Sequence, residues 1–331
     1  MTGVEKSVLA TIIYYDIFDF PLTLLEVFRY LINPSRVSGQ LEPGPGTLSL
    51  DEVRKSLNEL VSRGLVETRE GFYFPPRLNL GGRMLVQERI EKNKIAEEKW
   101  KKAKKYVFWL QVLPFVEIIF ASGSLALGHT SYDSDLDVLV VTKKGRIWLA
   151  RLLLILATSF LGVRRTKHEK IAPDKICLNH FISGNSLRIP FESLYNAQTY
   201  VHVTPLYYRS QSLAAEFYEQ NKWVKEFLPN CDWPSLFQQR AVKKARLLYA
   251  VKVFLEFTLN CSGLGKVLEK IARKIQRSRI DTNLPGRIIV NDEQLEFHPY
   301  SVEKSVINEF NQRISFSSFF GDYKELDSGL K

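Results

Sequence analysis

The sequence predicts a mixed α and β fold divided among several domains. The chain has 331 residues, more than one ordinary hydrophobic core accommodates, so two or three domains are expected. Residues 1–80 have helical periodicity followed by a hairpin-like pair of short strands. Residues 136–141 form an almost continuous apolar run, which is typical of a strand in a sheet covered on both faces. A charged connecting helix (81–114), a central α and β domain (115–205) and a mainly helical C-terminal domain (206–331) complete the predicted order.

Residues 1–80 predict three helices and then a hairpin. Helical segments at 7–18 and 22–32 are separated at Pro21, which cannot continue a helix. The third helix begins with a capping box of Ser49 and Glu52, and Gly64 is a suitable residue to follow its end. The two short strands, 65–67 and 72–74, come next.

This order, over about residues 5–76, resembles the winged-helix domains of transcription regulators. A helix that reads DNA presents net positive charge to the phosphates. The third helix instead has balanced charge, with Arg54, Lys55 and Arg63 against Asp51, Glu52 and Glu59. The sequence therefore favours DNA binding by this unit no more than protein docking or a purely structural role. Residues 84–108 are rich in Glu and Lys, which predicts a solvated connecting helix.

The residues that suggest chemistry lie between positions 117 and 141. Gly123 and Ser124 follow residues 117–122, which are expected to form a strand or the end of a helix, and Asp135 and Asp137 open the apolar run. Strand side chains alternate, so the two carboxylates point to one face, where a divalent cation would relieve their repulsion. Glycine lets the backbone approach a phosphate closely, and the Ser124 hydroxyl with nearby N–H groups can hold phosphate oxygens.

Gly-Ser followed by Asp-x-Asp at the start of an apolar strand resembles the signature of the DNA polymerase beta-like nucleotidyltransferase superfamily. The resemblance covers residues 119–141 and implies a catalytic domain over about 115–205, a mixed sheet flanked by helices. It implies that a hydroxyl attacks the α-phosphate of a nucleoside triphosphate and that pyrophosphate leaves. It also implies Mg²⁺ or Mn²⁺ bound by Asp135 and Asp137, with Gly123 and Ser124 binding the nucleotide. The alternative is a turn that caps a buried strand.

The family's third carboxylate, on a later strand, has no counterpart in residues 175–182. Asn179 is the first candidate for that catalytic position, as a neutral metal ligand or a substrate contact. His180 is an alternative as a base, and alternation predicts that these two side chains face opposite ways. Each is equally well explained as a hydrogen-bonded core residue. Asp174 before the strand and Glu192 after it are further sources of a carboxylate.

Other polar residues carry weaker signals. His129 lies between the two motifs and is interpreted mainly as an exposed loop residue. Lys143 and Lys144 end the apolar strand, where they meet phosphate or only water. A basic cluster, Arg164, Arg165 and Lys167, follows an apolar segment and suits either a polynucleotide or a solvated helix end.

The C-terminal third is strongly basic. Residues 240–279 contain eleven Lys and Arg, opposed only by Glu256 and Glu269. An apolar stripe runs among them, formed by Leu264, Val267, Leu268, Ile271 and Ile275. This basic amphipathic helix suits nucleic-acid phosphates, an acidic partner, an acidic membrane surface, or packing on the catalytic domain with its basic face in water.

Composition limits the remaining classes. The formal net charge of +10 favours anionic partners. The three cysteines, Cys177, Cys231 and Cys261, form neither a zinc pattern nor a disulfide framework, and no signal peptide is recognised, so a cytoplasmic location is expected. The apolar stretch 147–163 is interrupted by Arg151 and is shorter than the ~20 apolar residues of a spanning helix. A buried helix and no integral membrane segment are therefore predicted.

Together these observations favour a metal-dependent nucleotidyltransferase that uses a nucleoside triphosphate. The acceptor stays open between a small molecule, a protein hydroxyl and an RNA or DNA end. The alternative is a non-catalytic regulator that binds nucleotide or nucleic acid through a degenerate form of the same fold, which the missing third carboxylate favours.

Overall fold

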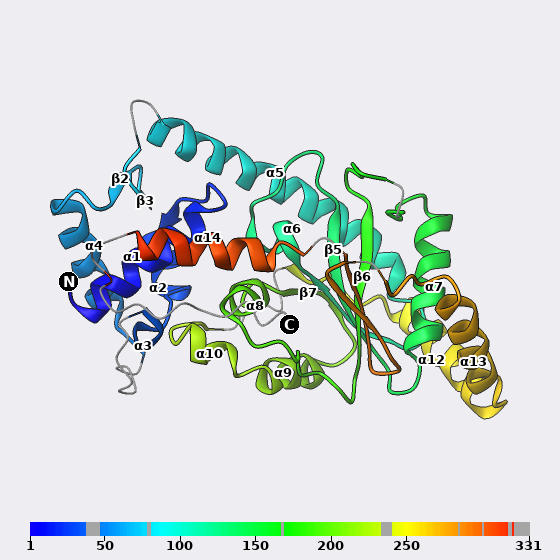
Figure 1. Ribbon diagram of the computed structural model, residues 1–331. Coiled ribbons are helices and arrows are strands. Elements are labelled where there is room, and N and C mark those ends of the chain that lie inside the picture. The colour runs from blue at the N-terminus through cyan, green and yellow to red at the C-terminus, as the bar shows by residue number, and fades with distance from the viewer. Residues whose placement is uncertain are drawn as a thin grey trace.

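The computed structural model has a mixed α and β architecture with two sheets (Figure 1). It describes residues 1–37, 47–77, 81–166, 169–232, 240–283, 285–299, 301–316 and 320. The predicted α+β class is confirmed at this level.

The N-terminal unit has the predicted helices and hairpin in the predicted order, with one additional short strand (Leu22–Thr23) and one additional short helix (Pro34–Val37). It contains α1 (Gly3–Asp16), β1 (Leu22–Thr23), α2 (Leu24–Arg29), α3 (Pro34–Val37), α4 (Leu50–Ser62), β2 (Glu67–Arg69) and β3 (Phe72–Phe74). The strands form an antiparallel sheet in the order β1-β3-β2. Ser49 and Glu52 form the predicted capping box at the start of α4, because each satisfies a backbone N–H that the helix leaves free.

The 30-residue helix α5 (Gly81–Leu110) connects the N-terminal unit to the larger sheet (Figure 1). The sequence predicts a solvated connecting helix here, and the helix is present. Its solvation is only partial, because Trp100, Ala103, Val107 and Leu110 are buried in the core beside the sheet. One face of α5 is therefore part of the domain that it leads into.

The larger sheet has six strands in the order β7-β4-β5-β6-β9-β8. Their bounds are β4 (Val116–Ala121), β5 (Leu136–Thr142), β6 (Ile176–Ser183), β7 (Thr204–Tyr208), β8 (Arg287–Val290) and β9 (Gln294–His298). β5 and β6 are parallel, and the other neighbours are antiparallel. The start of β5 therefore lies beside the start of β6 and beside the end of β4.

The remaining helices follow the strands along the chain. They are α6 (Gly123–Leu127), α7 (Ile147–Phe160), α8 (Leu194–Tyr200), α9 (Gln211–Gln220), α10 (Val224–Phe227), α12 (Arg246–Cys261), α13 (Leu264–Arg277) and α14 (Glu303–Ser315). The apolar stretch predicted to be a buried helix forms α7, which packs on β6 and α13.

Apolar side chains cover both faces of the sheet, as the continuous apolar run predicts. Leu139 and Val141 belong to one buried cluster, which continues into α8, α9, α14 and the helices of the N-terminal unit. Val138 and Val140 belong to the other cluster, which is shared with α5 and α7. The N-terminal unit thus shares its hydrophobic core with one face of the sheet.

The sheet extends further along the chain than the sequence predicts. Residues 206–331 are expected to form a mainly helical C-terminal domain, but β8 and β9 add two antiparallel strands to the edge at β6. Because strands this short have little periodicity, the sequence pattern does not reveal them. The predicted boundary at residue 205 does not coincide with the edge of the sheet, since β7 crosses it.

Among the described residues, no single helix is long and apolar enough to cross a membrane. Helices α12 and α13 meet that test of length and composition only as a pair, and they are bent by 91° at their junction.

Candidate active site

The two predicted motifs meet at one end of the large sheet. Asp135 immediately precedes β5 and Asp137 lies within it, while Gly123 begins α6 directly after β4. β4 and β5 are antiparallel, with Ala121 opposite Val138, so the end of β4 lies beside the start of β5. The backbone N–H of Ser122 donates to the carbonyl of Asp137 at 3.0 Å, which ties the turn to the acid-bearing strand.

Asn179 lies beside Asp137, which is where a side chain replacing the family's third carboxylate has to lie. Its Nδ2 donates a hydrogen bond of 3.2 Å to Oδ1 of Asp137. Asn179 is on β6, the parallel neighbour of β5, and the pairing of these strands shifts between Asp137 with Cys177 and Leu139 with His180. One residue of β5 therefore faces two residues of β6, which is a β-bulge.

The bulge corrects the prediction that Asn179 and His180 point to opposite faces. His180 pairs with Leu139, which lies two residues after Asp137 and so shares its face. Asn179 reaches Asp137 on that same face. A bulge breaks the alternation locally, so both polar side chains lie on one side. His180 is buried against β9, and burial lowers its pKa to about 3, which leaves it a weak base.

Gly123 is required by the geometry at this turn. Its φ of +57° lies in the left-handed region that side chains rarely adopt. A Cβ atom built there would lie 2.5 Å from Oδ2 of Asp137. The glycine predicted to admit a phosphate thus also makes room for the carboxylate beneath it. Ser124 follows on the same turn, and its carbonyl accepts from the backbone N–H of His129 at 2.9 Å.

An arginine neutralises part of the acidic pair. Nη1 of Arg165 lies 2.5 Å from Oδ2 of Asp135, and the two side chains are 34% and 15% exposed. Arg165 comes from the segment after α7, which pairs with the start of β6 through backbone bonds between Val163, Arg165 and Ile176. In the sequence Arg165 is part of a basic cluster. The structure assigns it to Asp135, whereas Lys167 lies outside the described residues.

The electrostatics of Asp137 reflect a carboxylate with too little positive charge around it. Burial, followed by the adjacent Asp135 carboxylate, raises the pKa of Asp137 to about 6, against lowering by Cys177, Arg165 and Asn179. Burial and both carboxylates also raise the pKa of the Cys177 thiol, so it is a neutral thiol here. A divalent cation would stabilise the ionised form of Asp137, because it supplies the missing positive charge.

The donor atoms fit a hard divalent cation. Ligand atoms of Asp135, Asp137 and Cys177 all lie within 4.8 Å of one another. Mg²⁺ is bound in proteins through one or two carboxylates, with waters and phosphate oxygens completing its shell. Asp135 and Asp137 match that pattern, while a neutral thiol is a poor ligand for so hard an ion. The carboxylates are therefore the residues of this chain that would hold Mg²⁺ or Mn²⁺.

Lys99 supports the site in a way that the sequence does not reveal. It lies on α5, is 2% exposed, and its Nζ donates to the carbonyls of Tyr132 and Ser134 and to Oδ1 of Asp174. These contacts hold the loop that leads into Asp135. Lys99 is one of many lysines in a charged helix, so only its burial distinguishes it.

The further candidates for a third carboxylate are engaged elsewhere. Asp174 binds Lys99 and also Lys102, its ion-pair partner at 2.5 Å. Glu192 is exposed, pairs with Arg188, and follows β6 at the end of the sheet away from Asp137. Asn179 is therefore the side chain that β6 places against the acidic pair.

The remaining polar candidates lie away from the two carboxylates. His129 is half-buried against the ring of Phe20 at a centroid distance of 5.1 Å, which corrects the expectation of an exposed loop residue. Burial and Lys92 lower its pKa to about 4. Lys143 and Lys144 are exposed, but they lie past the far end of β5 from Asp137.

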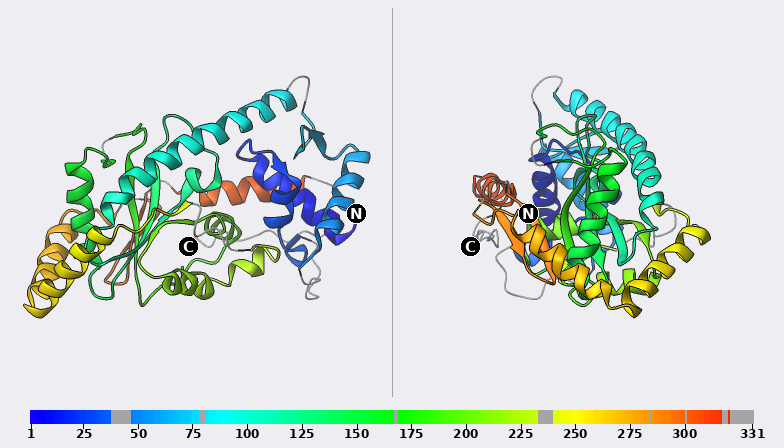
Figure 2. Two further views of the ribbon diagram at one scale, coloured as in Figure 1. Left: turned by 180° about the vertical axis from the view of Figure 1, so that it is seen from behind. Right: turned by 90° about the vertical axis from the view of Figure 1, so that its right-hand side faces the viewer.

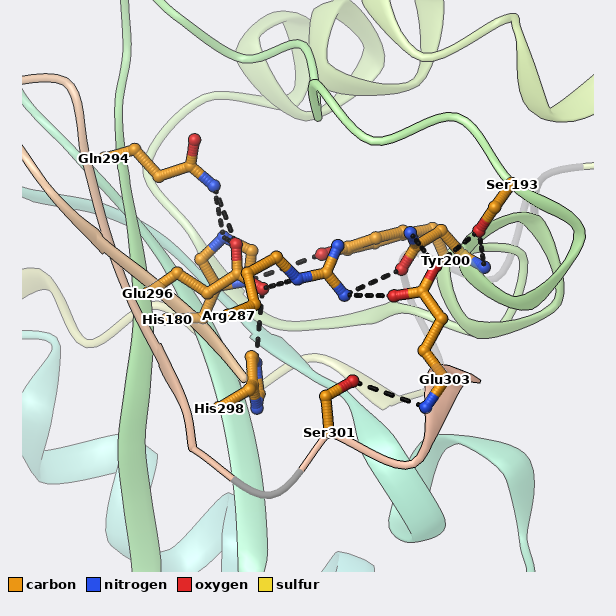
Figure 3. A network of polar contacts seen from close by, with 10 residues as sticks. His180, Ser193, Tyr200, Arg287, Gln294, Glu296, His298, Ser301 and Glu303 are labelled. Atoms are coloured by element: carbon orange, nitrogen blue, oxygen red, sulfur yellow. Dashed lines mark hydrogen bonds and ion pairs between the residues drawn. The ribbon is translucent and has the colours of Figure 1, made fainter. Parts of the chain in front are cut away.

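A second cluster of ionisable groups lies on the same sheet, around β8, β9 and α14 (Figure 3). Arg287 is placed between two buried glutamates, 3.0 Å from Glu296 and 2.9 Å from Glu303. Ser193 and Asn196 donate further hydrogen bonds to Glu303. This cluster contains its own cation and donors, which gives it the character of an internal structural network.

Two histidines adjoin that network. The ligand atoms of His180, Glu296 and His298 lie within 4.8 Å of one another. Arg287, however, pairs with Glu296 at 3.0 Å and is only 6% exposed, whereas Arg165, the cation beside the β5 pair, is 34% exposed. The pair on β5 is thus the better candidate for a cation site.

No protein-family model matches the chain, and no curated protein or solved structure matches it either.

Proposed function

We propose that the protein is a metal-dependent nucleotidyltransferase of the DNA polymerase beta-like type. The proposal depends on one observation, the juxtaposition of Asp135 and Asp137 with the Gly123-Ser124 turn at one end of the sheet. A mixed sheet with helices on both faces supports it, since the resemblance implies that architecture.

Each residue then has a distinct task. Asp135 and Asp137 hold Mg²⁺ or Mn²⁺, which would neutralise charge on the phosphate oxygens during transfer. Gly123 and Ser124 contact the triphosphate through backbone N–H groups and the hydroxyl. Asn179 donates to Asp137 and so orients that carboxylate. Arg165, already paired with Asp135, contributes a second positive charge for the phosphates.

The second candidate is a protein that binds a nucleotide without transferring it. Asn179 favours this candidate, because an amide supplies neither the negative charge of a third carboxylate nor a general base. The Arg165–Asp135 ion pair also favours it, since the cation occupies a carboxylate oxygen that a metal would use. Replacing Asn179 with Asp separates the candidates: a gain in transfer rate supports a weakened enzyme.

We also propose that the N-terminal unit is a winged-helix-like domain that docks protein. The order of α1, β1, α2, α4 and the hairpin supports the comparison, as does the β1-β3-β2 sheet. On α4, Arg54 and Lys55 both pair with Asp51 of the same helix. These basic groups are already neutralised, which disfavours phosphate contact. The free cysteines fit the cytoplasmic setting expected from the sequence.

The function is tested by transfer of label from each of the four ribonucleoside triphosphates, with Mg²⁺ or Mn²⁺, and by calorimetry of nucleotide binding. We expect metal-dependent binding that Asp137→Asn weakens by about ten-fold or more, equivalent to about 1.4 kcal/mol. Asp135→Asn should have a similar effect, and neither change should unfold the protein.

The matched control is Asp133→Asn, because Asp133 is an exposed acid in the preceding turn. Its affinity for the metal-nucleotide complex should equal that of the unaltered protein. Identical affinities for all four proteins would refute the assignment of the metal site. Tight, metal-dependent binding with no label transfer, including by Asn179→Asp, would support the non-catalytic candidate.

A further inference from the structure

The helix α12 packs on the protein through charged groups. Lys252 is 0% exposed and Glu256 is 4% exposed, although both are charged residues. Lys252 donates to the carbonyl of Val116 and to the Tyr207 hydroxyl. Glu256 accepts from the backbone N–H of Phe115 at 2.8 Å and pairs with Arg209 at 2.8 Å. The polar side of α12 thus faces the sheet.

The apolar side chains of α12 consequently face solvent. Leu247 is 75% exposed, Phe254 is 65% exposed and Phe257 is 63% exposed. Further exposed residues with apolar surface on this helix are Tyr249, Val251, Val253 and Leu255. A helix that is apolar over most of its surface is normally buried in a core or in lipid. Exposed apolar residues gathered on one helix in this way mark an interaction site.

The next helix, α13, repeats this inverted arrangement. Its buried residues are Gly265, Ala272 and Gln276, and Glu269 accepts hydrogen bonds from the backbone N–H groups of Trp148 and Leu149 on α7. The apolar stripe predicted from the sequence faces solvent: Leu264, Val267, Leu268, Ile271 and Ile275 are all exposed. Both helices therefore present most of their apolar residues to solvent and use mainly small or polar residues for internal packing, with Leu259 of α12 as an apolar contact to the core.

The charge around these stripes is of one sign. The acids of the two helices, Glu256 and Glu269, are engaged with the protein itself. The exposed charged residues between positions 243 and 279 are basic, and the exposed acid Asp281 follows them; the basic residues are Lys243, Lys244, Arg246, Lys266, Lys270, Arg273, Lys274, Arg277 and Arg279. Only Arg273 among them has an ion pair to an acid elsewhere, at 3.0 Å from Asp292, in the part of the chain that the structure describes. The partner should accordingly offer an apolar interior with an anionic border.

We propose that the helix pair α12–α13, residues 246–277, binds the surface of a bilayer containing anionic phospholipid. Interfacial helices combine an apolar face with Lys and Arg on the polar side, as α13 does. Exposed Phe254, Phe257 and Tyr249 suit the boundary between acyl chains and headgroups. Each helix is shorter than a spanning segment and the pair is bent by 91°, which suits helices lying in the interface.

Two other occupants fit less well. A second copy of this chain would bring two basic surfaces together across the interface, where like charges repel. A polynucleotide would neutralise the basic residues but would leave the apolar side chains of α12 and α13 in water. An anionic bilayer satisfies both properties of the surface. The helix pair also lies at the end of the molecule away from the N-terminal unit, where it protrudes (Figures 1 and 2).

This inference is independent of nucleotidyl transfer, because it concerns α12 and α13 and not the acids on β5. It is tested by floating the full-length protein with vesicles of phosphatidylcholine alone or mixed with phosphatidylglycerol. We expect binding to the anionic vesicles at low salt, weaker binding at high salt, and little binding to pure phosphatidylcholine.

Two variants separate the apolar and the basic contributions. Phe254→Ser with Phe257→Ser should reduce affinity about ten-fold or more, because the two rings lose their burial in lipid. Lys266, Lys270 and Lys274, all changed to Gln, should reduce it about 100-fold, since each lysine near an anionic surface contributes to binding. All five positions are exposed, so circular dichroism and thermal melting should match the unaltered protein.

Two matched control variants change the same number of exposed apolar residues to Ser, or of exposed lysines to Gln, outside α12 and α13. Leu25→Ser with Met84→Ser alters apolar residues that are 61% and 60% exposed. Lys94, Lys101 and Lys105 changed to Gln alters three exposed lysines of α5. Both controls should bind vesicles like the unaltered protein.

Four outcomes would overturn the proposal. One is absence of binding to anionic vesicles at low salt, and another is undiminished binding by the Phe254 and Phe257 variant. The third is an oligomer that the unaltered protein forms without lipid, as seen by light scattering, and that the Phe254 and Phe257 variant does not form, when neither of these two proteins binds vesicles. RNA or DNA binding lost in the lysine variant but kept in the phenylalanine variant, without vesicle binding, would likewise point to a polynucleotide surface.

Discussion

Two pairs of carboxylates lie at the large sheet, one pair at the start of β5 and the other between β9 and α14, and their surroundings differ. Glu296 and Glu303 are 1% and 0% exposed, and Arg287 lies between them (Figure 3). Within the described residues, Asp135 and Asp137 have one cation beside them, Arg165, which forms an ion pair with Asp135 and not with Asp137 and is itself 34% exposed. The first pair is compensated within the protein, whereas the second keeps one carboxylate short of positive charge.

This difference distinguishes a structural cluster from a candidate binding site. A buried ion network is stable only if its charges and hydrogen bonds are satisfied internally. The network at Arg287 meets that condition in part: Ser193 and Asn196 bind Glu303, and Arg287 pairs with both glutamates, while Arg287 Nη1 is left without a hydrogen-bond partner. Burial raises the pKa of Asp137 to about 6, and it also raises the pKa of Glu296 and Glu303. The difference is that each glutamate has an ion pair with Arg287, whereas no ion pair to Asp137 is formed within the described residues. A carboxylate that the fold leaves uncompensated is suited to an external cation.

The largest expected effect concerns the compensated pair. Arg287→Met removes the cation shared by Glu296 and Glu303, and uncompensated buried charge should lower the free energy of unfolding by about 3–5 kcal/mol. Arg165→Met is the matched change at the open pair and should lower it by less than about 1 kcal/mol, because that ion pair is partly solvated. Urea denaturation of both variants at pH 7 measures the contrast. Equal losses would remove the distinction between the two pairs.

A smaller effect is expected at Asp137 itself. Its pKa rises from 3.8 to about 6 on folding, so the folded protein holds this proton more tightly than the unfolded chain. The stability of the metal-free protein should therefore fall as the pH rises from about 4 to about 6, and the loss should persist at pH 7. Asp137→Asn removes this cost, so it should be more stable at pH 7 by about 2 kcal/mol.

Urea denaturation in the presence of a chelator, at pH 4 and at pH 7, checks this expectation. Asp133→Asn provides the control, because that exposed carboxyl should leave the pH dependence unchanged. An Asp137→Asn protein that is less stable than the unaltered one at pH 7 would show that the acidic pair is already compensated.

The smallest expected effect concerns Ser124. Ser124→Ala removes one hydroxyl that can donate to a charged phosphate, which should weaken nucleotide binding by about 1 kcal/mol or somewhat more. Stability should be almost unchanged, since the side chain is half-exposed on a short turn. Calorimetry with Mg²⁺ and a nucleoside triphosphate measures the loss, and Ser62→Ala, an exposed serine of α4, is the control. An unchanged affinity would place the phosphates elsewhere.

Local patterns in the sequence predict much of the architecture. The capping box at Ser49 and Glu52 and the apolar run after Asp135 depend on nearest neighbours and on alternation, which the chain carries in its own order. Helix α4 and strand β5 follow from these two patterns, while the sequence leaves the segment that forms β4 open between a strand and the end of a helix. The spacing of Asp135 and Asp137 also places both carboxylates at the start of one strand before any tertiary contact is known.

Other features depend on contacts between distant segments. The bulge in β6 brings Asn179 and His180 to one face, and no local pattern announces it because it arises from pairing with β5. Lys99 reaches Asp174 across 75 positions of the chain, and Arg165 reaches Asp135 across 30. Burial and charge pairing are properties of the folded chain, so a sequence full of lysines does not identify the one that is buried.

The C-terminal helices show this division most clearly. The sequence by itself predicted a basic amphipathic helix within residues 240–279, with an apolar stripe from Leu264 to Ile275. The structure divides this region into two helices, α12 and α13, at Ser262 and Gly263. An apolar stripe is ordinarily assigned to the core, yet here Gly265, Ala272 and Gln276 face the protein. Only the tertiary structure decided which side faces inward, because α7 offers backbone N–H groups that Glu269 can accept from. Satisfying those polar groups orients the helix, and its apolar stripe remains exposed.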